Sequence, residues 1–147
     1  MKKVLCVFVT VIMLLSRMTA CNFHSTVNDG FGNTQAKSLP KVEEMLAFLC
    51  AGDTESAIQI LHPDVQGNAE HAMRQNSDYL LDHKVQKVET ITRSVYTSKG
   101  TAGDIQQETA YFKVFLEHDD VIAVSAVHLT NDTGEGFSSF QVVLGVY

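Results

Sequence analysis

The stretch QQETAYFKVFLEHDDVIAVSAVHLT (residues 106–130) predicts two neighbouring β-strands joined by a short loop. Its first part has an apolar residue at every second position, namely Ala110, Phe112, Val114 and Leu116, so one face of a strand over residues 106–116 is apolar. Residues 121–130 are apolar on both faces, which is typical of a central strand. The charged residues 118–120 between them predict a hairpin loop.

Two further strands are predicted on either side of this pair. Residues 88–96 are rich in β-branched side chains, and residues 137–146 place Phe140, Val142, Leu144 and Val146 on one face. Residues 98–104 and 131–136 contain glycines and turn formers, so they predict the remaining hairpin loops. The C-terminal part of the chain therefore predicts a four-stranded antiparallel sheet.

Helical periodicity precedes the strands. Residues 42, 45, 46 and 49 are apolar and predict a helix that has Pro40 in its first turn and Ser38 as its cap. Asp53 is expected to cap a second helix, and residues 68–82 predict a third, with Ala69, Ala72, Met73 and Leu80 facing inward. About three N-terminal helices packed on one face of a four-stranded antiparallel sheet make an α+β fold.

Length and charge limit the organisation and the partners of the chain. Residues 38–147 are enough for one hydrophobic core, so we predict a single α+β domain there. Residues 1–21 contain three of the 11 basic residues and no acidic one, which leaves eight basic and 17 acidic residues in the remainder. That excess of negative charge argues against a nucleic-acid partner, because binding to phosphates needs clustered Lys and Arg.

The N-terminus has the pattern of an export signal. Lys2 and Lys3 precede an apolar run over residues 4–15, and small residues lead to Cys21. Met18, Thr19, Ala20 and Cys21 resemble the lipobox of bacterial lipoproteins. The resemblance implies a signal peptide over residues 1–21, a lipid on Cys21 and anchoring to a membrane of the bacterial cell envelope. The alternative is an ordinary signal cut after Ala20 that leaves a free thiol.

Polar residues 22–37 then predict a flexible tether. Beyond it, residues 51–57 (AGDTESA) and 61–65 (LHPDV) resemble the opening of the nuclear transport factor 2-like (cystatin-like) superfamily. The resemblance implies a curved sheet closed by helices into a cone, often with an interior pocket. Enzymes of that superfamily use Asp, His and Tyr inside the cone. The candidate pocket residues are His62, Asp64, Tyr111 and His128, with His71 and Tyr79 as further candidates.

The predicted function is a lipid-anchored extracytoplasmic module that binds a small ligand or an envelope protein without catalysis. The alternative is a small isomerase- or dehydratase-like enzyme in which a buried Asp–His pair acts as base and acid. A third alternative is a homodimer through the open sheet face, where we expect Tyr111, Phe115 and Phe137 to be exposed. No cofactor is predicted, and the six histidines show no metal-binding spacing.

Overall fold

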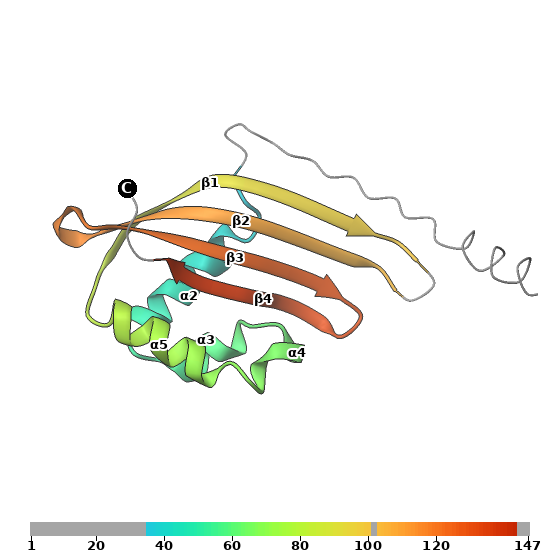
Figure 1. Ribbon diagram of the computed structural model, residues 1–147, viewed down its shortest axis with the longest axis horizontal. Coiled ribbons are helices and arrows are strands. Elements are labelled where there is room, and N and C mark those ends of the chain that lie inside the picture. Colours follow the sequence, from blue (N-terminus) through green and yellow to red (C-terminus); the bar gives the residue numbers. More distant parts are fainter. Residues whose placement is uncertain (1–34, 101–102, 144–147) are drawn as a thin grey trace, which may run out of the picture.

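The protein combines four helices with one antiparallel sheet in residues 35–100 and 103–143, which a computed structural model describes (Figure 1). The helices are α2 (Leu39–Cys50), α3 (Thr54–Gln59), α4 (Pro63–Gln66) and α5 (Glu70–Leu80). The strands are β1 (Val85–Ser98), β2 (Ile105–Leu116), β3 (Val121–Asn131) and β4 (Gly134–Val143), with a 3-10 turn, η1 (Glu117–Asp119), after β2. The sheet order is β1-β2-β3-β4, which confirms the predicted α+β class and antiparallel four-stranded sheet.

Several predicted features lie outside the described residues. They are the signal peptide over residues 1–21, the lipid site Cys21, residues 22–34 of the tether and the inward positions Leu144 and Val146 of the last strand. Within the described residues, no helix combines the length and the apolar character that crossing a membrane requires.

The helices lie on one face of the sheet, and the core fills the space between the two layers (Figure 1). The predicted face of α2 is confirmed, because Val42, Met45, Leu46 and Leu49 are fully buried. From the sheet, the alternation in β2 buries Ala110, Phe112, Val114 and Leu116 against them. Asp53 caps α3 as expected, its Oδ1 accepting a hydrogen bond of 3.1 Å from the Ser56 amide.

The buried face of helix α5 differs in part from the face that its sequence predicts. Met73 and Leu80 are buried as expected, but Ala72 is exposed and Ser77 is buried. Ser77 tolerates burial because its hydroxyl donates a 2.9 Å hydrogen bond to the Leu49 carbonyl on α2. A buried hydroxyl with a partner costs little, so this polar position serves as a contact between the two helices.

The short helix α4, which the sequence did not predict, begins at Pro63 and is held against the sheet. The His62 amide donates to the Phe137 carbonyl at 2.9 Å, and the Phe137 amide donates to the Ile60 carbonyl at 3.2 Å. This parallel bridge brings the backbones very close at Gly136, where an added Cβ would lie 2.5 Å from the His62 nitrogen. A residue without a Cβ is therefore required at position 136 for α4 to dock there.

An irregularity in the pairing of β3 with β4 decides where Phe137 points. Val127 pairs with Ser139 and His128 with Phe137, so Ser138 is an extra residue in β4. A bulge of this kind resets the alternation of side chains, and both Phe137 and Phe140 face the helices. The expectation that Phe137 is exposed on the open sheet face is therefore wrong, since its side chain is completely buried.

Candidate functional site

A buried carboxylate, Glu108 on β2, organises the edge of the core where α2 begins. Its Oε1 accepts hydrogen bonds from the Ser38 amide at 2.8 Å and the Ser38 hydroxyl at 2.6 Å. Its Oε2 accepts from the Lys37 amide at 3.2 Å and from Arg93 Nε at 2.6 Å. The sequence predicts that Ser38 caps α2, but its side chain makes no capping hydrogen bond. Its hydroxyl donates to Glu108 instead.

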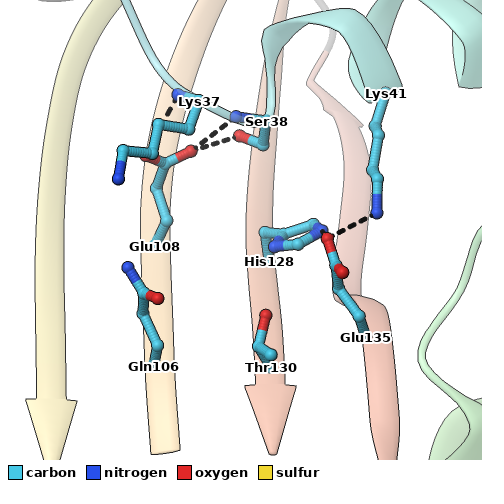
Figure 2. A pocket seen from close by; sticks show the side chains of 8 residues that line it. All are labelled: Lys37, Ser38, Lys41, Gln106, Glu108, His128, Thr130 and Glu135. Atoms are coloured by element: carbon cyan, nitrogen blue, oxygen red, sulfur yellow. Dashed lines mark hydrogen bonds and ion pairs between the residues drawn. The ribbon is translucent and has the colours of Figure 1, made fainter.

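Next to Glu108 a polar pocket of about 150 Å³ opens between α2 and the sheet (Figure 2). We call it the His128 pocket; its lining residues are Lys37, Ser38, Lys41, Gln106, Glu108, His128, Thr130 and Glu135. Strands β2, β3 and β4 form the floor, and the first turn of α2 with the residues before it forms the roof. At roughly 30 Å³ per water, the volume suits a molecule about as large as five waters.

His128 lies at the centre of this pocket and has an unused hydrogen-bonding atom. Its side chain is only 13% exposed, and the ring packs edge-on against Phe137 with centroids 5.4 Å apart. Within the described residues, the buried Nε2 has no hydrogen-bond partner. Glu135 Oε1 lies 3.5 Å from Nε2 but is held at 2.7 Å by Lys41 Nζ. A buried nitrogen without a partner is costly, so a partner from outside the protein would stabilise it.

The surroundings shift the pKa values of three groups in the His128 pocket. Burial is the main cause that lowers the pKa of His128 below 6.5, and the Lys41 charge adds to it. Burial works to raise the pKa of Glu108, but hydrogen bonds from Ser38, Lys37 and Arg93 outweigh it and lower the pKa. The hydrogen bond and charge of Lys41 lower the pKa of Glu135. At neutral pH the pocket therefore holds a neutral imidazole between two ionised carboxylates.

The second predicted histidine, His62, lies in a different and closed environment, the His62 corner, which also contains Asp64, Asn131 and Thr133. Its fully buried ring accepts a 3.3 Å hydrogen bond from the Asp64 amide at Nδ1 and lies 3.0 Å from Asn131 Oδ1 through Nε2. These two contacts place the proton of a neutral ring on Nε2. Both nitrogens have partners, so His62 connects α4 to the β3–β4 turn. It is not among the residues that line the His128 pocket.

The four predicted pocket residues do not form one site. His62 and Asp64 are neighbours, with Nδ1 and Oδ2 3.4 Å apart, but the Asp64 side chain is 56% exposed and accepts from the Thr133 hydroxyl. Tyr111 points to the opposite face of the sheet and is 47% exposed. Of the four, His128 is the one that lines the polar pocket. His71 and Tyr79 are exposed on α5.

Sequence reasoning missed the partners of His128 in the pocket. One signal was present for Glu108, because it shares the inward parity of Ala110, Phe112 and Val114 and so had to point a carboxylate into the core. Nothing comparable marks Lys41 or Glu135. Those two residues meet only because the fold brings the start of β4 within reach of the first turn of α2.

Two further hollows in the described part of the chain are larger than the His128 pocket. One, of about 500 Å³, lies beside α2 and the start of β1 and includes Ala47, Cys50, Val85 and Val88. The other, of about 290 Å³, lies between α5 and β4 next to Tyr79 and Phe140. Neither contains an unpaired buried polar atom. The described residues contain no cluster of three His, Cys, Asp or Glu side chains that could hold a metal ion.

The open face of the sheet carries the aromatic residues considered for dimerisation. Tyr111 is exposed there and Phe115 is partly buried under the ammonium group of Lys113, 4.9 Å from the ring centroid. Because Phe137 lies in the core instead, this face is less aromatic than expected, and dimerisation through it stays a prediction. Sedimentation that shows only monomer at high protein concentration would rule it out.

Comparison of the chain with protein-family models, with curated proteins and with solved structures finds no match.

Proposed function

We propose that the protein is a lipid-anchored extracytoplasmic module that binds a small ligand in the His128 pocket and does not catalyse a reaction. The observation that carries the proposal is that His128 lines this pocket while its buried Nε2 has no hydrogen-bond partner among the described residues. Polar groups from four elements surround it, so a ligand would meet both donors and acceptors. An envelope protein that inserts one polar side chain would satisfy the same atom.

A ligand titration tests the pocket. Ring nitrogen signals of His128 should shift when a panel of small polar metabolites is added to the labelled protein and followed by NMR. In the variant His128→Gln, the backbone amide signals of the other pocket residues should shift less on ligand addition than in the wild-type protein. His71→Gln should leave these shifts unchanged, because His71 is exposed on α5 and does not line the pocket. A panel that shifts no pocket signal would refute the proposal.

The anchor belongs to the same proposal and rests on residues 18–21, which resemble a lipobox. Two or more acyl chains hold a protein firmly in a membrane, since each buried CH₂ contributes about 0.8 kcal/mol. In intact cells the Cys21→Ser form should move from the membrane fraction to the soluble extracytoplasmic fraction. A Cys50→Ser form is the matched control and should stay anchored; equal retention of both variants would contradict lipidation at Cys21.

The resemblance of residues 51–57 and 61–65 to the nuclear transport factor 2-like superfamily implies a shape for the binding site. In the nuclear transport factor 2-like arrangement, a curved sheet and its helices form a cone with a pocket inside. The helices that cover one face of the sheet support this proposal, as does the location of the His128 pocket between those layers. Large side chains fill the remaining interior, including Phe112, Phe137, Met45 and Leu46, so we place the ligand at the polar end of the cone.

The enzyme alternative is favoured by one observation, the distance of 3.5 Å between His128 Nε2 and Glu135 Oε1 in a pocket. A neutral imidazole beside a carboxylate can act as a general base in an isomerase- or dehydratase-like reaction. General acid catalysis by the carboxylate would require a raised pKa, but Lys41 lowers the pKa of Glu135. That direction supports binding over catalysis.

Deuterium exchange separates the two functions. If the protein is an enzyme of this class, it should exchange protons next to the carbonyl group of a small ketone or acid, and His128→Gln should abolish the exchange. If a panel of such compounds binds without exchange, the protein is a binding module.

A further inference from the structure

We infer that the groove between helix α5 and the outer edge of strand β4, the α5–β4 groove, binds an extended, uncharged peptide segment of a partner protein. The segment adds to the sheet as a fifth strand beside β4. This site is separate from the His128 pocket, so the inference goes beyond the proposed function and does not depend on it. It follows from the open backbone groups of β4, from the helix face beside them, and from the uncharged lining of the groove.

The outer side of β4 already pairs with an extended piece of the chain. Of the described strands, β3 alone pairs with β4, so β4 is an edge strand. On its outer side, the Phe137 amide donates to the Ile60 carbonyl, and the Phe137 carbonyl accepts from the His62 amide. This edge therefore accepts backbone hydrogen bonds from a segment that lies alongside it.

Beyond this bridge, the outer side of β4 stays open at Phe140 and Val142. The Asn76 side-chain amide donates to the Phe140 carbonyl at 3.4 Å, so the backbone groups of Phe140 point away from β3. The register from Phe140 to Val143 is regular, and backbone groups alternate along a strand, so those of Val142 also point outward. Among the described residues, these groups have no further hydrogen-bond partner outside the sheet. Free backbone groups on an edge strand are a template for pairing with another chain.

Helix α5 forms the second wall of the α5–β4 groove. In Figure 1, α5 lies below the arrowhead end of β4, and a hollow of about 290 Å³ separates them. Residues 72, 75, 76 and 79 line it from one face of α5, and residues 140–142 line it from β4. At roughly 30 Å³ per water, the volume suits about ten heavy atoms, such as one side chain with its adjoining backbone. A peptide beside β4 can thus direct alternate side chains toward α5.

The lining of the α5–β4 groove determines which peptide fits. All the described residues that line it are uncharged, and Gln75, Asn76 and Gln141 carry side-chain amides that can both donate and accept hydrogen bonds. A charged peptide side chain would lose part of its hydration here without meeting an opposite charge in the lining. Tyr79 is 45% exposed and offers aromatic surface to an apolar side chain. The groove therefore favours an uncharged segment that contains an apolar residue.

Selection from a library of random short peptides displayed on phage tests this inference, with the purified full-length protein as the target. Ala72→Trp places a large side chain in the groove at an exposed position of α5, where it should not impair folding. His71→Trp is the matched control, because His71 is exposed on the same helix and does not line the groove. Peptides enriched on the wild-type protein should bind His71→Trp equally well and Ala72→Trp roughly tenfold more weakly.

Val142→Pro tests the backbone hydrogen bonds. Proline at an edge position removes an amide that points outward and leaves the bonds to β3 in place, so the variant should fold. The enriched peptides should bind it roughly fivefold more weakly, because one hydrogen bond to the peptide is lost. In the wild-type protein, hydrogen exchange of the Val142 amide should slow when an enriched peptide is added, since a peptide carbonyl then accepts from it.

Three outcomes would overturn the inference. The first is the absence of peptides that are enriched on the wild-type protein relative to Ala72→Trp. The second is an enriched peptide that leaves the exchange of the Val142 amide unchanged and binds Val142→Pro as tightly as the wild-type protein. The third is sedimentation that shows a dimer for the wild-type protein and a monomer for Ala72→Trp, which would assign the groove to a second copy of the chain.

Discussion

The two histidines that flank Phe137 differ in one respect, which is whether their ring nitrogens are satisfied. His62 is fully buried between α3 and α4, and Asp64 and Asn131 occupy both of its nitrogens. His128 on β3 is largely buried and lines a pocket, and its Nε2 has no hydrogen-bond partner in the described part of the chain. His62 is therefore a structural residue, whereas we expect His128 to contact a ligand.

The two carboxylates of the His128 pocket repeat this difference. Glu108 accepts four hydrogen bonds and joins the residues before α2 to the sheet. Glu135 is about half exposed and has one close partner, Lys41. Removing a buried group that has hydrogen-bond partners should therefore lower the free energy of unfolding. Removing a group that lacks such partners should instead weaken ligand binding. The following predictions test that distinction, beginning with the largest effect.

Glu108→Ala should lower the free energy of unfolding by about 3 kcal/mol. It leaves Arg93 and two backbone amides without an acceptor near the core, and breaking a buried ion pair typically costs about 3–5 kcal/mol. Arg93 is partly exposed, which places the effect at the lower end. Urea unfolding measures the change, with Glu44→Ala, an exposed residue of α2, as the control. Similar stabilities of the two variants would mean that Glu108 is not structural.

His62→Ala should cost about 2 kcal/mol, because it removes two hydrogen bonds and leaves a small cavity beside Phe137. The same change at the exposed His71 should alter the free energy of unfolding by less than about 0.5 kcal/mol. If His62→Ala is as stable as His71→Ala, the His62 corner does not hold α4 in place.

His128→Leu should change stability at pH 7.5 by less than about 1 kcal/mol. The substitution keeps an apolar side chain against Phe137 and removes a nitrogen that has no partner within the described residues, so no satisfied hydrogen bond is lost. Ligand binding should be lost in the same variant. A large loss of stability, comparable to that of His62→Ala, would show that His128 is a structural residue instead.

Acidification should destabilise the protein through His128 before it does so through Glu108. Burial lowers the pKa of His128 in the folded state, with Lys41 and His62 adding to the effect and Glu135 and Glu108 opposing it. The unfolded chain then takes up this proton first, so stability is lost as the pH falls below about 6.5 and is unaffected above it. The lowered pKa of Glu108 adds a further loss below its ordinary value of 4.5.

Urea unfolding between pH 7.5 and 5 measures the His128 contribution. The wild-type protein should lose more stability over this interval than His128→Leu does. Equal losses would place the titrating group elsewhere.

Tyr111→Ser should have the smallest effect on stability, below about 1 kcal/mol, and no effect on ligand binding. Tyr111 is exposed on the face of the sheet opposite the His128 pocket. Thermal unfolding and the NMR ligand titration both measure this variant. A loss of ligand binding would mean that the open sheet face, and not the His128 pocket, forms the site.

Much of the fold was predictable because its signals are local. The spacing of Val42, Met45, Leu46 and Leu49 defines a helix face within one short segment, and the alternation in β2 defines a strand face in the same way. The side chain of Asp53 caps a helix whose amides lie only a few residues away. The expectation for Phe137 failed because the extra residue Ser138 changes the period of β4, and the expectation for α5 failed because a hydrogen bond to Leu49 on α2 allows Ser77 to be buried.

The candidate site was less predictable, because its contacts join residues far apart in the chain. Ser38 and Glu108 are 70 positions apart, and Lys41 and Glu135 are 94 apart. His128 was identified as a candidate from its residue type and its strand, but so were His62, Asp64 and Tyr111, which the fold directs elsewhere. Residue type alone does not distinguish a histidine with two partners from one with an unpaired nitrogen.

The sequence by itself therefore determined the α+β class, the inward faces of α2 and β2, and the acidic character of the chain. Only the tertiary structure decided that β4 carries an extra residue, that both ring nitrogens of His62 have partners, and that His128 lines a pocket between two ionised carboxylates, each paired with a basic side chain. The physical reason is the distance along the chain over which each interaction acts. Hydrophobic periodicity and capping act within a few residues, whereas hydrogen-bond satisfaction and local charge depend on which distant segments meet.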